Sequence, residues 1–202
     1  MTPRCQICII DNDEAIRESL RLLLFAAGLS SCAYESADAF LEDENNRSIA
    51  CMLLDIRMPG MDGLELFSIL RQEQLQYPVI FITGHGDIPL AVSAIKLGAY
   101  DFLTKPFREG ELLEKVHAAI VHHRSNKQQT QELSELRARL SSCTPREHDV
   151  MRLLVQGLPN KGIAETLGIS PRTVEIHRAH VMEKMLAESL PALVRMVSMV
   201  EK

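Results

Sequence analysis

The stretch Cys51-Met52-Leu53-Leu54-Asp55-Ile56-Arg57-Met58-Pro59-Gly60 decides how the rest of the chain is interpreted. Four apolar residues run into one carboxylate, and a Pro-Gly turn follows. This pattern predicts a fully buried strand that ends at Asp55. The carboxyl ends of buried parallel strands are where open α/β sheets bind ligands. Asp55 is therefore either a residue that only caps the next turn or the centre of a site, and the rest of the chain must decide between these.

Four more apolar runs alternate with segments that have helical spacing. The expected strands cover residues 6–10, 31–34, 51–55, 78–83 and 100–103, and the expected helices cover residues 16–27, 36–42, 63–70, 88–97 and 111–122. Strands this apolar are buried on both faces by the helices that connect them. The sequence therefore predicts an α/β domain over residues 1–121, a doubly wound five-stranded parallel sheet.

Residues 143–202 have an all-helical pattern, which predicts a second and smaller domain. Thr144-Pro145-Arg146-Glu147 is a capping box with proline at the first helical position. A short helix over residues 160–167, a turn at Gly168-Ile169 and a longer helix capped by Ser170-Pro171 follow. This order is the helix-turn-helix plan.

Residues 122–142 separate these two domains and are rich in Gln, Ser, Glu and Arg. Leu133, Leu136 and Leu140 recur there at heptad spacing, which predicts a helical linker. The repeat is too short to establish a coiled coil without other support.

Composition and charge limit the classes of function. In this chain of 202 residues no run approaches 18 apolar residues, and the N-terminus lacks the apolar core of a signal peptide, so we expect a cytoplasmic protein with no membrane partner. Residues 1–142 hold 14 basic and 20 acidic side chains, whereas residues 143–202 hold 8 and 7. The acidic N-terminal part and the near-neutral C-terminal part indicate two parts with different functions, but this charge alone does not prove nucleic-acid binding.

The five cysteines are odd in number and have apolar neighbours, which predicts reduced thiols in the core. Cys5-x-x-Cys8 has no second pair at metal-ligand spacing and opens a strand. Zinc or redox chemistry is therefore disfavoured at this pair.

Chemistry-bearing side chains stand at the ends of four expected strands, and parallel strands end at one rim of their sheet. The residues are Asp11, Asn12 and Asp13 in the turn after the first strand, Asp55, Thr83 and Lys105. Carboxylates and a backbone carbonyl are the hard oxygen ligands that Mg²⁺ requires. A carboxylate beside that ion can attack a phosphoryl group while an ammonium balances the charge on its oxygens. Such a set favours a phosphoryl-transfer site over solvated strand ends.

On these residues, together with the segments Phe81-Ile82-Thr83-Gly84-His85-Gly86-Asp87-Ile88-Pro89 and Gly157-Leu158-Pro159-Asn160-Lys161, the chain resembles the two-component response regulators of the NarL/FixJ family. Residues 1–121 look like the flavodoxin-like receiver domain, and residues 143–202 look like the LuxR-type output domain. The resemblance implies a protein that a sensor histidine kinase phosphorylates and that then binds double-stranded promoter DNA as a homodimer. RNA polymerase is a further candidate partner.

The resemblance also implies a role for each residue of the rim. Asp55 is the phosphoacceptor, Thr83 is the switch hydroxyl, and Lys105, before a cis Pro106, is the partner of the phosphoryl group. Phe102 is the aromatic residue whose rotamer reports activation. Mg²⁺ is held by Asp11, Asn12, Asp55 and the backbone carbonyl of Arg57.

Asn12 departs from the family's pattern, which usually has a second carboxylate at this position. An amide oxygen can still bind Mg²⁺ but brings no negative charge, so we expect weaker metal binding. The neighbouring Asp13 is a candidate to compensate.

The helix after Ser170 can be divided into faces from its spacing. Its apolar face is expected to pack inside and holds Val174, Val181 and Met185. The opposite face is expected to read bases in the major groove and holds Arg172, Glu175, Ile176, Ala179 and Glu183. Side chains beside it are expected at the flanks and the phosphates, and these are Lys161, Thr173, His177, Arg178, His180 and Lys184. The alternative is an ordinary solvated helix face, which the helix-turn-helix plan and the resemblance disfavour.

Two other functions compete with this interpretation. An aspartyl-phosphate phosphatase of the haloacid-dehalogenase type also uses a strand-end Asp, but it usually has a second Asp where this chain has Arg57. A signalling adaptor that dimerises through its last helix would not need DNA, whereas the segment 170–184 favours DNA binding. We therefore expect a phosphorylation-switched transcription regulator and not an enzyme.

Overall fold

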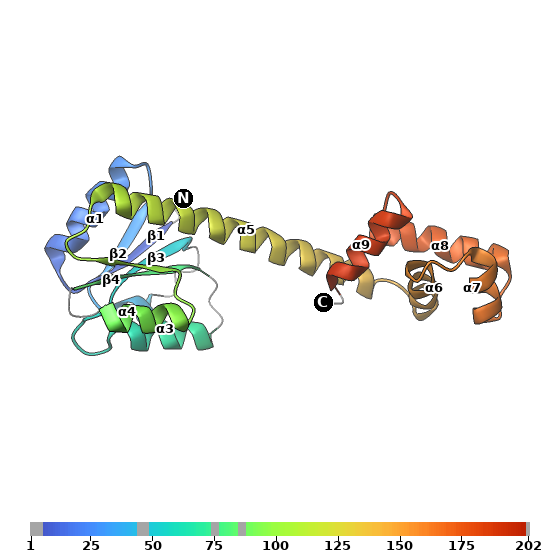
Figure 1. Cartoon of the computed structure of the whole chain (residues 1–202), viewed down its shortest axis with the longest axis horizontal. Helices are drawn as coiled ribbons and strands as arrows, with labels where there is room; N and C mark the ends of the chain where they lie inside the picture. The colour runs from blue at the N-terminus through green and yellow to red at the C-terminus, as the bar shows by residue number, and fades with distance from the viewer. Residues whose placement is uncertain (1–5, 44–48, 74–76, 85–87, 201–202) are drawn as a thin grey trace. The chain divides into compact units, whose positions relative to one another are not determined.

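The computed structural model describes residues 6–43, 49–73, 77–84 and 88–200, and the chain divides into two compact units, residues 1–126 and 127–202. Cys5 and the loop residues His85, Gly86 and Asp87 lie outside the described residues. The first unit is a sheet with helices on both faces, and the second unit is built from helices in its described part (Figure 1).

Five strands form one all-parallel sheet in the first unit, in the order β2-β1-β3-β4-β5. They are β1 (Ile7–Ile10), β2 (Ser31–Tyr34), β3 (Cys51–Asp55), β4 (Val79–Thr83) and β5 (Asp101–Thr104). Every residue of β1, β3 and β4 is buried, as the apolar runs predict for strands covered on both faces. The chain leaves β1 toward one edge of the sheet, at β2, and then returns to the other side of β1, at β3. The carboxyl ends of β1 and β3 therefore border the crevice where sheets of this kind bind ligands. The predicted doubly wound sheet is confirmed.

Within the described ranges, five helices flank this sheet. They are α1 (Glu14–Ala26), α2 (Ala37–Glu42), α3 (Gly63–Gln72), α4 (Ile88–Lys96) and α5 (Glu109–Ser141). Figure 1 shows α1 and α5 on one face of the sheet and α3 and α4 on the other. The buried clusters give the same division, since Leu20 of α1 and Val116 of α5 belong to one cluster, and Phe40 of α2 and Phe67 of α3 belong to the other.

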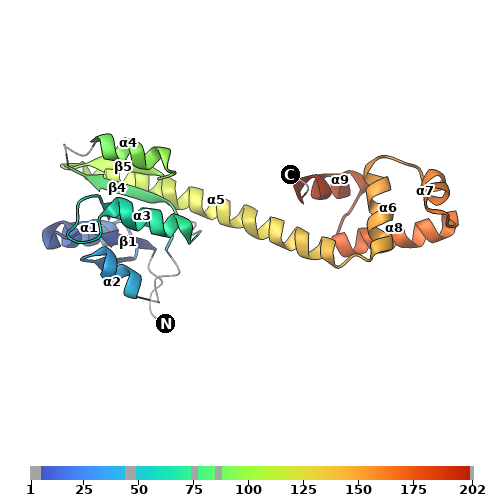
Figure 2. The same ribbon diagram turned by 90° about the horizontal axis from the view of Figure 1, so that it is seen from below.

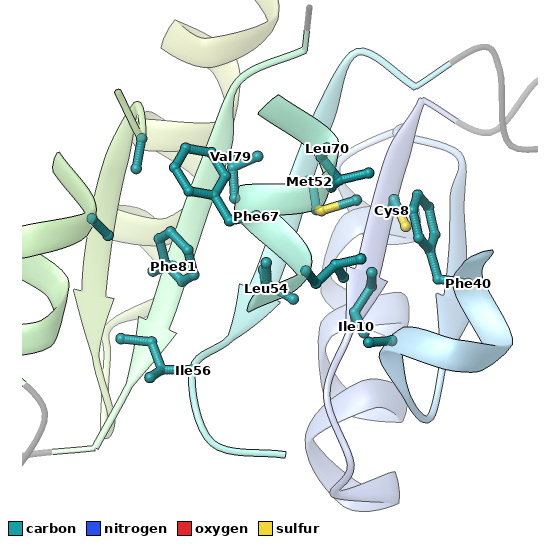
Figure 3. Packing of buried hydrophobic residues seen from close by; sticks show 14 of the residues in the cluster. Cys8, Ile10, Phe40, Met52, Leu54, Ile56, Phe67, Leu70, Val79 and Phe81 are labelled. Atoms are coloured by element: carbon teal, nitrogen blue, oxygen red, sulfur yellow. The ribbon is translucent and has the colours of Figure 1, made fainter. Parts of the chain in front are cut away.

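The core on the α3 face is packed around aromatic rings. Phe67 and Phe81 meet edge to face with their ring centroids 5.5 Å apart, and Figure 3 shows both rings inside the cluster. Tyr34 and Phe40 make a second T-shaped pair at 5.4 Å. Aromatic pairs of this geometry contribute roughly 0.5–1.5 kcal/mol each beyond their buried area. The packing holds β4 against α3 and fixes the position of the strand ends.

The N-terminus of α3 lies directly against the end of β3. Asp62 caps this helix in a capping box with Glu65, and the backbone N–H of Gly63 donates to the carbonyl of Ile56 at 2.9 Å. A Cβ added to Gly63 would lie 2.1 Å from the backbone oxygen of Asp55. Only glycine fits there, so Gly63 permits the contact that positions Asp55.

One uninterrupted helix, α5, runs for 33 residues from Glu109 to Ser141 (Figure 2). The predicted helix end at His122 is wrong, and the predicted helical conformation of the linker is confirmed over residues 122–141. Residues 111–142 contain neither glycine nor proline, so no residue there interrupts the helical hydrogen bonds. The domain boundaries predicted at residues 121 and 142 stay predictions. No described helix, α5 included, combines the length and the hydropathy needed to cross a membrane.

The second unit continues, up to residue 200, with α6 (Pro145–Val155), α7 (Asn160–Leu167), α8 (Pro171–Met185) and α9 (Leu190–Val200). Gly168 ends α7 with a φ of 65°, a left-handed conformation that favours glycine. Ser170 then caps α8 by accepting from the backbone N–H of Thr173 at 3.1 Å. The predicted inner face of α8 is buried at Val174, Val181 and Met185.

A buried carboxylate joins the start of α6 to the end of α8. Glu147 is 3% exposed, and its Oε2 accepts from Lys184 Nζ at 2.6 Å and from the backbone N–H of Thr144 at 2.8 Å. Lys184 also donates to the backbone oxygen of Ser142 at 3.2 Å. The hydrogen bond from Lys184, followed by that from Thr144, lowers the pKa of Glu147 from 4.5 to about 2.

Three cysteines, Cys8, Cys51 and Cys143, are free and buried, as predicted for core thiols. Burial raises the pKa of the Cys8 and Cys51 thiols, which keeps both protonated and unreactive. Cys32 is disulfide-bonded, so the prediction of a reduced thiol is wrong there. Unlike the core thiols, Cys32 lies on the edge strand β2 and is only half-buried.

Glu147→Gln should flatten the acid-dependence of the second unit's stability. The pKa of Glu147 is lower in the folded chain than its ordinary value, so its stabilisation is present above about pH 4.5 and is lost as the pH falls toward about 2. Urea unfolding of α6 and α8, followed by the NMR intensities of their amides at pH 7 and pH 3, measures this loss. Glu165→Gln, which changes an exposed carboxylate on α7, is the matched control. An equal loss on acidification in wild type and Glu147→Gln would contradict the assignment.

Candidate functional site

Four strand ends supply the residues of the candidate phosphorylation site. Asp11 follows β1, Asp55 ends β3, Thr83 ends β4, and Lys105 follows β5. Because Asp55 pairs with Ile82 in the parallel register, Thr83 lies one position beyond Asp55 along the neighbouring strand. The sheet thus places these side chains at one edge, as the sequence predicts for parallel strands.

Lys105 lies between two buried carboxylates. Its Nζ is 2.7 Å from Asp11 Oδ2 and 3.5 Å from Asp55 Oδ1. Asp11 is 1% exposed and Asp55 is 7% exposed. One ammonium can neutralise only one of two ionised carboxylates, so the pair retains an excess of negative charge. Such a pocket suits a hard cation that binds oxygen ligands.

The surroundings of Asp55 act on its pKa in both directions. Burial raises the pKa of this carboxyl and the neighbouring Asp11 raises it further, whereas Lys105 and the backbone N–H of Ile56 lower it. A bound cation would favour the ionised form of the carboxyl. Protons and a cation therefore compete for Asp55.

The turn after β1 is held by hydrogen bonds around Asp11. Asp11 Oδ1 accepts from the backbone N–H of Asp13 at 2.9 Å, and its backbone oxygen accepts from Arg17 Nη1 at 2.8 Å. Asp13 Oδ1 accepts from two backbone N–H groups in the first turn of α1, so this oxygen serves as the helix cap. Asn12, between the two Asp residues, is exposed. Asp13 is therefore less free to replace the charge that Asn12 lacks.

Two residues that position the site were not among the predicted site residues. Arg17 holds the backbone of Asp11 from one turn inside α1, and Gly63 permits the approach of α3 to Asp55. A glycine at the start of a predicted helix beside a strand-end Asp is a usable signal for the second residue. Arg17 has no such signal, because one basic side chain on an amphipathic helix is common. The side chain of Arg57, whose carbonyl is a predicted metal ligand, is exposed.

Thr83 and Phe102 lie on neighbouring strands beside this pocket. Thr83 is fully buried, and its hydroxyl donates to the backbone oxygen of Gly84 at 3.1 Å. Phe102 pairs in register with Phe81, is half-buried and packs against the core on the α3 face. The hydroxyl therefore bonds a local acceptor that a phosphoryl oxygen could replace, and the ring has an apolar cluster to pack into.

A second candidate site lies on the helix-turn-helix of the second unit. The outward face of α8 is exposed at the residues predicted to read bases, namely Arg172, Glu175, Ile176, Ala179 and Glu183. Ile176 is 50% exposed. An apolar side chain between charged ones on an exposed helix face can contact a thymine methyl group in the major groove.

The residues beside this face connect α7 with α8. Arg178 Nη1 donates to Asn160 Oδ1 at 3.2 Å, and the hydroxyls of Thr173 and Ser170 share a hydrogen bond of 2.8 Å. Lys161 is exposed in the first turn of α7. The contact between Arg178 and Asn160 joins the two helices, whereas that between Ser170 and Thr173 lies within the first turn of α8. The side chain of Lys161 stays at the surface.

Three residues predicted at the flanks of α8 have neighbours at the start of α6. Lys184 pairs with Glu147 Oε2, and His180 Nδ1 is 3.5 Å from Glu147 Oε1. His177 is half-buried and its Nδ1 is covered. The ammonium of Lys184 is therefore used inside the unit, where it compensates a buried carboxylate.

Two family models match the chain. The model for the response regulator receiver domain matches residues 7–117, which contain Asp11, Asp55 and Lys105. The model for bacterial regulatory proteins of the luxR family matches residues 141–197, which contain α8. The first unit thus matches a receiver-domain family, and the second unit matches a family of bacterial regulatory proteins.

Curated relatives align along nearly the whole length. The transcriptional regulatory protein FixJ of Bradyrhizobium diazoefficiens is 44% identical over 97% of this chain and 96% of its own. FixJ of Azorhizobium caulinodans is 48% identical over 93% of this chain and 89% of its own. The response regulator TodT of Pseudomonas putida is 44% identical over 94% of this chain and 83% of its own.

Solved structures give the same assignment. The response regulator StyR aligns with a TM-score of 0.88 at 39% identity, over 96% of this chain and 98% of its own. Full-length FixJ from B. japonicum aligns with a TM-score of 0.62 at 43% identity, over 99% and 98%. The chain therefore belongs to the FixJ-like transcriptional response regulators of two-component systems, which join a receiver domain to a luxR-type DNA-binding domain.

Proposed function

We propose that a sensor histidine kinase phosphorylates this response regulator on Asp55, and that the phosphorylated chain dimerises and binds promoter DNA. The proposal rests on the position of Asp55 at a strand end, where Lys105 Nζ lies 3.5 Å from its carboxylate. The same ammonium is also paired with the carboxylate of Asp11. A lone strand-end carboxylate would lack both the cation and the second acid. The cytoplasm, which holds promoter DNA, is the compartment in which this function operates.

Phosphoryl transfer needs Asp55 as nucleophile and Lys105 as charge partner. An oxygen of Asp55 attacks the phosphorus of a phosphohistidine on the kinase, and the N–P bond breaks as the O–P bond forms. Lys105 then pairs with the new phosphoryl oxygens, which carry more negative charge than the carboxylate did. Its ammonium lies nearer to Asp11 than to Asp55 before transfer, so it turns toward Asp55 during this step.

The donor set of this pocket fits Mg²⁺. Two buried carboxylates share one ammonium, and the amide of Asn12 stands next to Asp11. Asp11, Asn12, Asp55 and the backbone carbonyl of Arg57 would hold the ion. When bound, the ion supplies positive charge to the oxygens of the transferred phosphoryl group.

Thr83 and Phe102 couple phosphorylation of Asp55 to a rearrangement of the surface through which the chain dimerises. The Thr83 hydroxyl exchanges its bond to Gly84 for one to a phosphoryl oxygen, which is the stronger acceptor. The movement frees space for the Phe102 ring to pack inward and remodels the surface of α4 and β5. Dimerisation then doubles the DNA contacts, which a domain of near-neutral charge needs for affinity.

In the DNA complex, α8 lies in the major groove. Arg172 can donate to guanine, Glu175 can accept from a cytosine amine, and Ile176 with Ala179 can contact thymine methyl groups. Lys161, Thr173 and Arg178 contact the backbone, with His177 and His180 at the edge of the surface. We assign Lys184 to the fold, since its ammonium compensates Glu147. RNA polymerase stays a candidate partner.

Asp55→Asn should abolish phosphorylation, because an amide cannot accept the phosphoryl group. With the labelled phosphohistidine kinase or a small phosphodonor in Mg²⁺, wild type should take up label and shift from monomer to dimer in sedimentation velocity. The variant should do neither. Asp38→Asn, which changes an exposed carboxylate at the start of α2, should behave as wild type. Undiminished labelling of Asp55→Asn would refute the assignment.

Asn12→Asp should tighten Mg²⁺ binding, on the order of tenfold, because it adds an anionic oxygen ligand beside Asp11. The metal-free variant should also be less stable than wild type, since three carboxylates then repel one another. Calorimetric titration and urea unfolding measure the two effects. Asn126→Asp adds the same charge on α5 and should change neither. An unchanged Mg²⁺ dissociation constant in Asn12→Asp would exclude this position from the metal site.

Glu175→Ala and Ile176→Ala should change which bases are preferred, each lost contact costing about 1–3 kcal/mol at the cognate site. Lys161→Ala should weaken all duplexes alike and reduce the salt slope by about one unit, because a phosphate contact is independent of sequence. Selection from a random duplex library and titrations at several salt concentrations separate these effects. Lys127→Ala, on α5, is the control. If Lys161→Ala changed base preference while Glu175→Ala and Ile176→Ala changed only affinity, α8 would be docked differently.

A further inference from the structure

Three side chains that can bind a metal ion gather between α6 and α8, far in sequence from the acidic pocket of the receiver domain. One ligand atom from each of Glu147, His177 and His180 lies within 4.8 Å of the ligand atoms of the other two. The two histidines are three residues apart on α8, so their side chains extend from the same side of the helix. The function proposed above gives this group no task beyond the edge of the DNA surface.

The carboxylate of Glu147 has one oxygen available for a further ligand. Its Oε2 accepts from Lys184 and from the Thr144 N–H, whereas its Oε1 lies 3.5 Å from His180 Nδ1. Tetrahedral coordination with bonds of about 2.0–2.1 Å places ligand atoms roughly 3.3–3.5 Å apart. Glu147 Oε1 and His180 Nδ1 already have this spacing, and a ring nitrogen of His177 lies within 4.8 Å of the ligand atoms of both, a gap that a side-chain rotation can close.

His177 provides an independent reason to expect a ligand. Its Nδ1 is covered from solvent and has no hydrogen-bond partner among the described residues. A buried polar atom without a partner is costly, and a bound ion or an ordered water that it holds removes this cost. His180 is 52% exposed at its side chain, so the group is open to an entering ion from one side.

We propose that Glu147, His177 and His180 form a binding site for a divalent transition-metal ion such as Zn²⁺, with water as a further ligand. Two imidazoles and one carboxylate suit zinc, nickel or copper ions, whereas Mg²⁺ prefers oxygen ligands alone. Lys184 stays on the opposite oxygen of Glu147, and its charge makes the site weaker than a structural zinc site. The bound ion cross-links α6 to α8 and stabilises the second unit. This site is independent of the phosphorylation of Asp55.

The test compares full-length wild type with His180→Gln and with His148→Gln, which changes a histidine of α6 outside the group. Zn²⁺ is titrated against a chromophoric chelator in excess Mg²⁺, which occupies the acidic pocket. His180→Gln should raise the Zn²⁺ dissociation constant about tenfold or more, and His148→Gln should leave it unchanged. In wild type, Zn²⁺ should shift the imidazole resonances of His177 and His180. The exposure of His180 makes its variant a safe one for folding, which circular dichroism verifies.

His177→Gln gives a second variant of the same site and should also weaken binding. Equal Zn²⁺ affinity in wild type, His180→Gln and His148→Gln would place the ion elsewhere and overturn the proposal. Failure of wild type to bind Zn²⁺, or binding that leaves both imidazole resonances unshifted, would also overturn it. None of these outcomes bears on the labelling of Asp55, so the two proposals fail separately.

Discussion

The ammonium of Lys105 between the carboxylates of Asp11 and Asp55 is the interaction on which the receiver unit depends. Two buried carboxylates without it would repel each other, and one would take up a proton. Its three groups follow or end β1, β3 and β5, so the charge balance exists only when those strands lie parallel and in register. One cation for two anions leaves the pocket ready to accept a second cation.

The backbone of Asp55 is fixed in position by the packing around it. Gly63 lets α3 approach until a Cβ would be 2.1 Å from the oxygen of Asp55, and the Gly63 N–H is bonded to Ile56. On the same strand, Leu54 packs in the cluster that contains Phe67 and Phe81. The phosphoacceptor therefore sits on a rigid strand end, whereas Thr83 has a weak local hydrogen bond that can change. Rigidity at one residue and freedom at its neighbour are what a switch requires.

The fold was predictable because its signals are local in the sequence. Buried strands appear as apolar runs, the Thr144 capping box and Gly168 mark helix ends, and parallel strands bring Asp55 and Lys105 to one rim. The length of α5 was missed at His122, since a change in composition does not end a helix without a breaker. The pairing of Lys184 was missed because helical spacing places a side chain on a face but does not reveal which distant side chain lies opposite.

The two units use the same chemical pair for opposite purposes. Glu147 and Lys184 are one carboxylate and one ammonium, and backbone N–H and C=O groups satisfy their remaining capacity. That balance stabilises the link between α6 and α8 and offers no excess charge on Oε2. Asp11, Asp55 and Lys105 are two carboxylates with one ammonium. The charge of these three groups is therefore not balanced until a further cation or a proton binds. Stoichiometry, more than residue type, separates the structural ion pair from the reactive one.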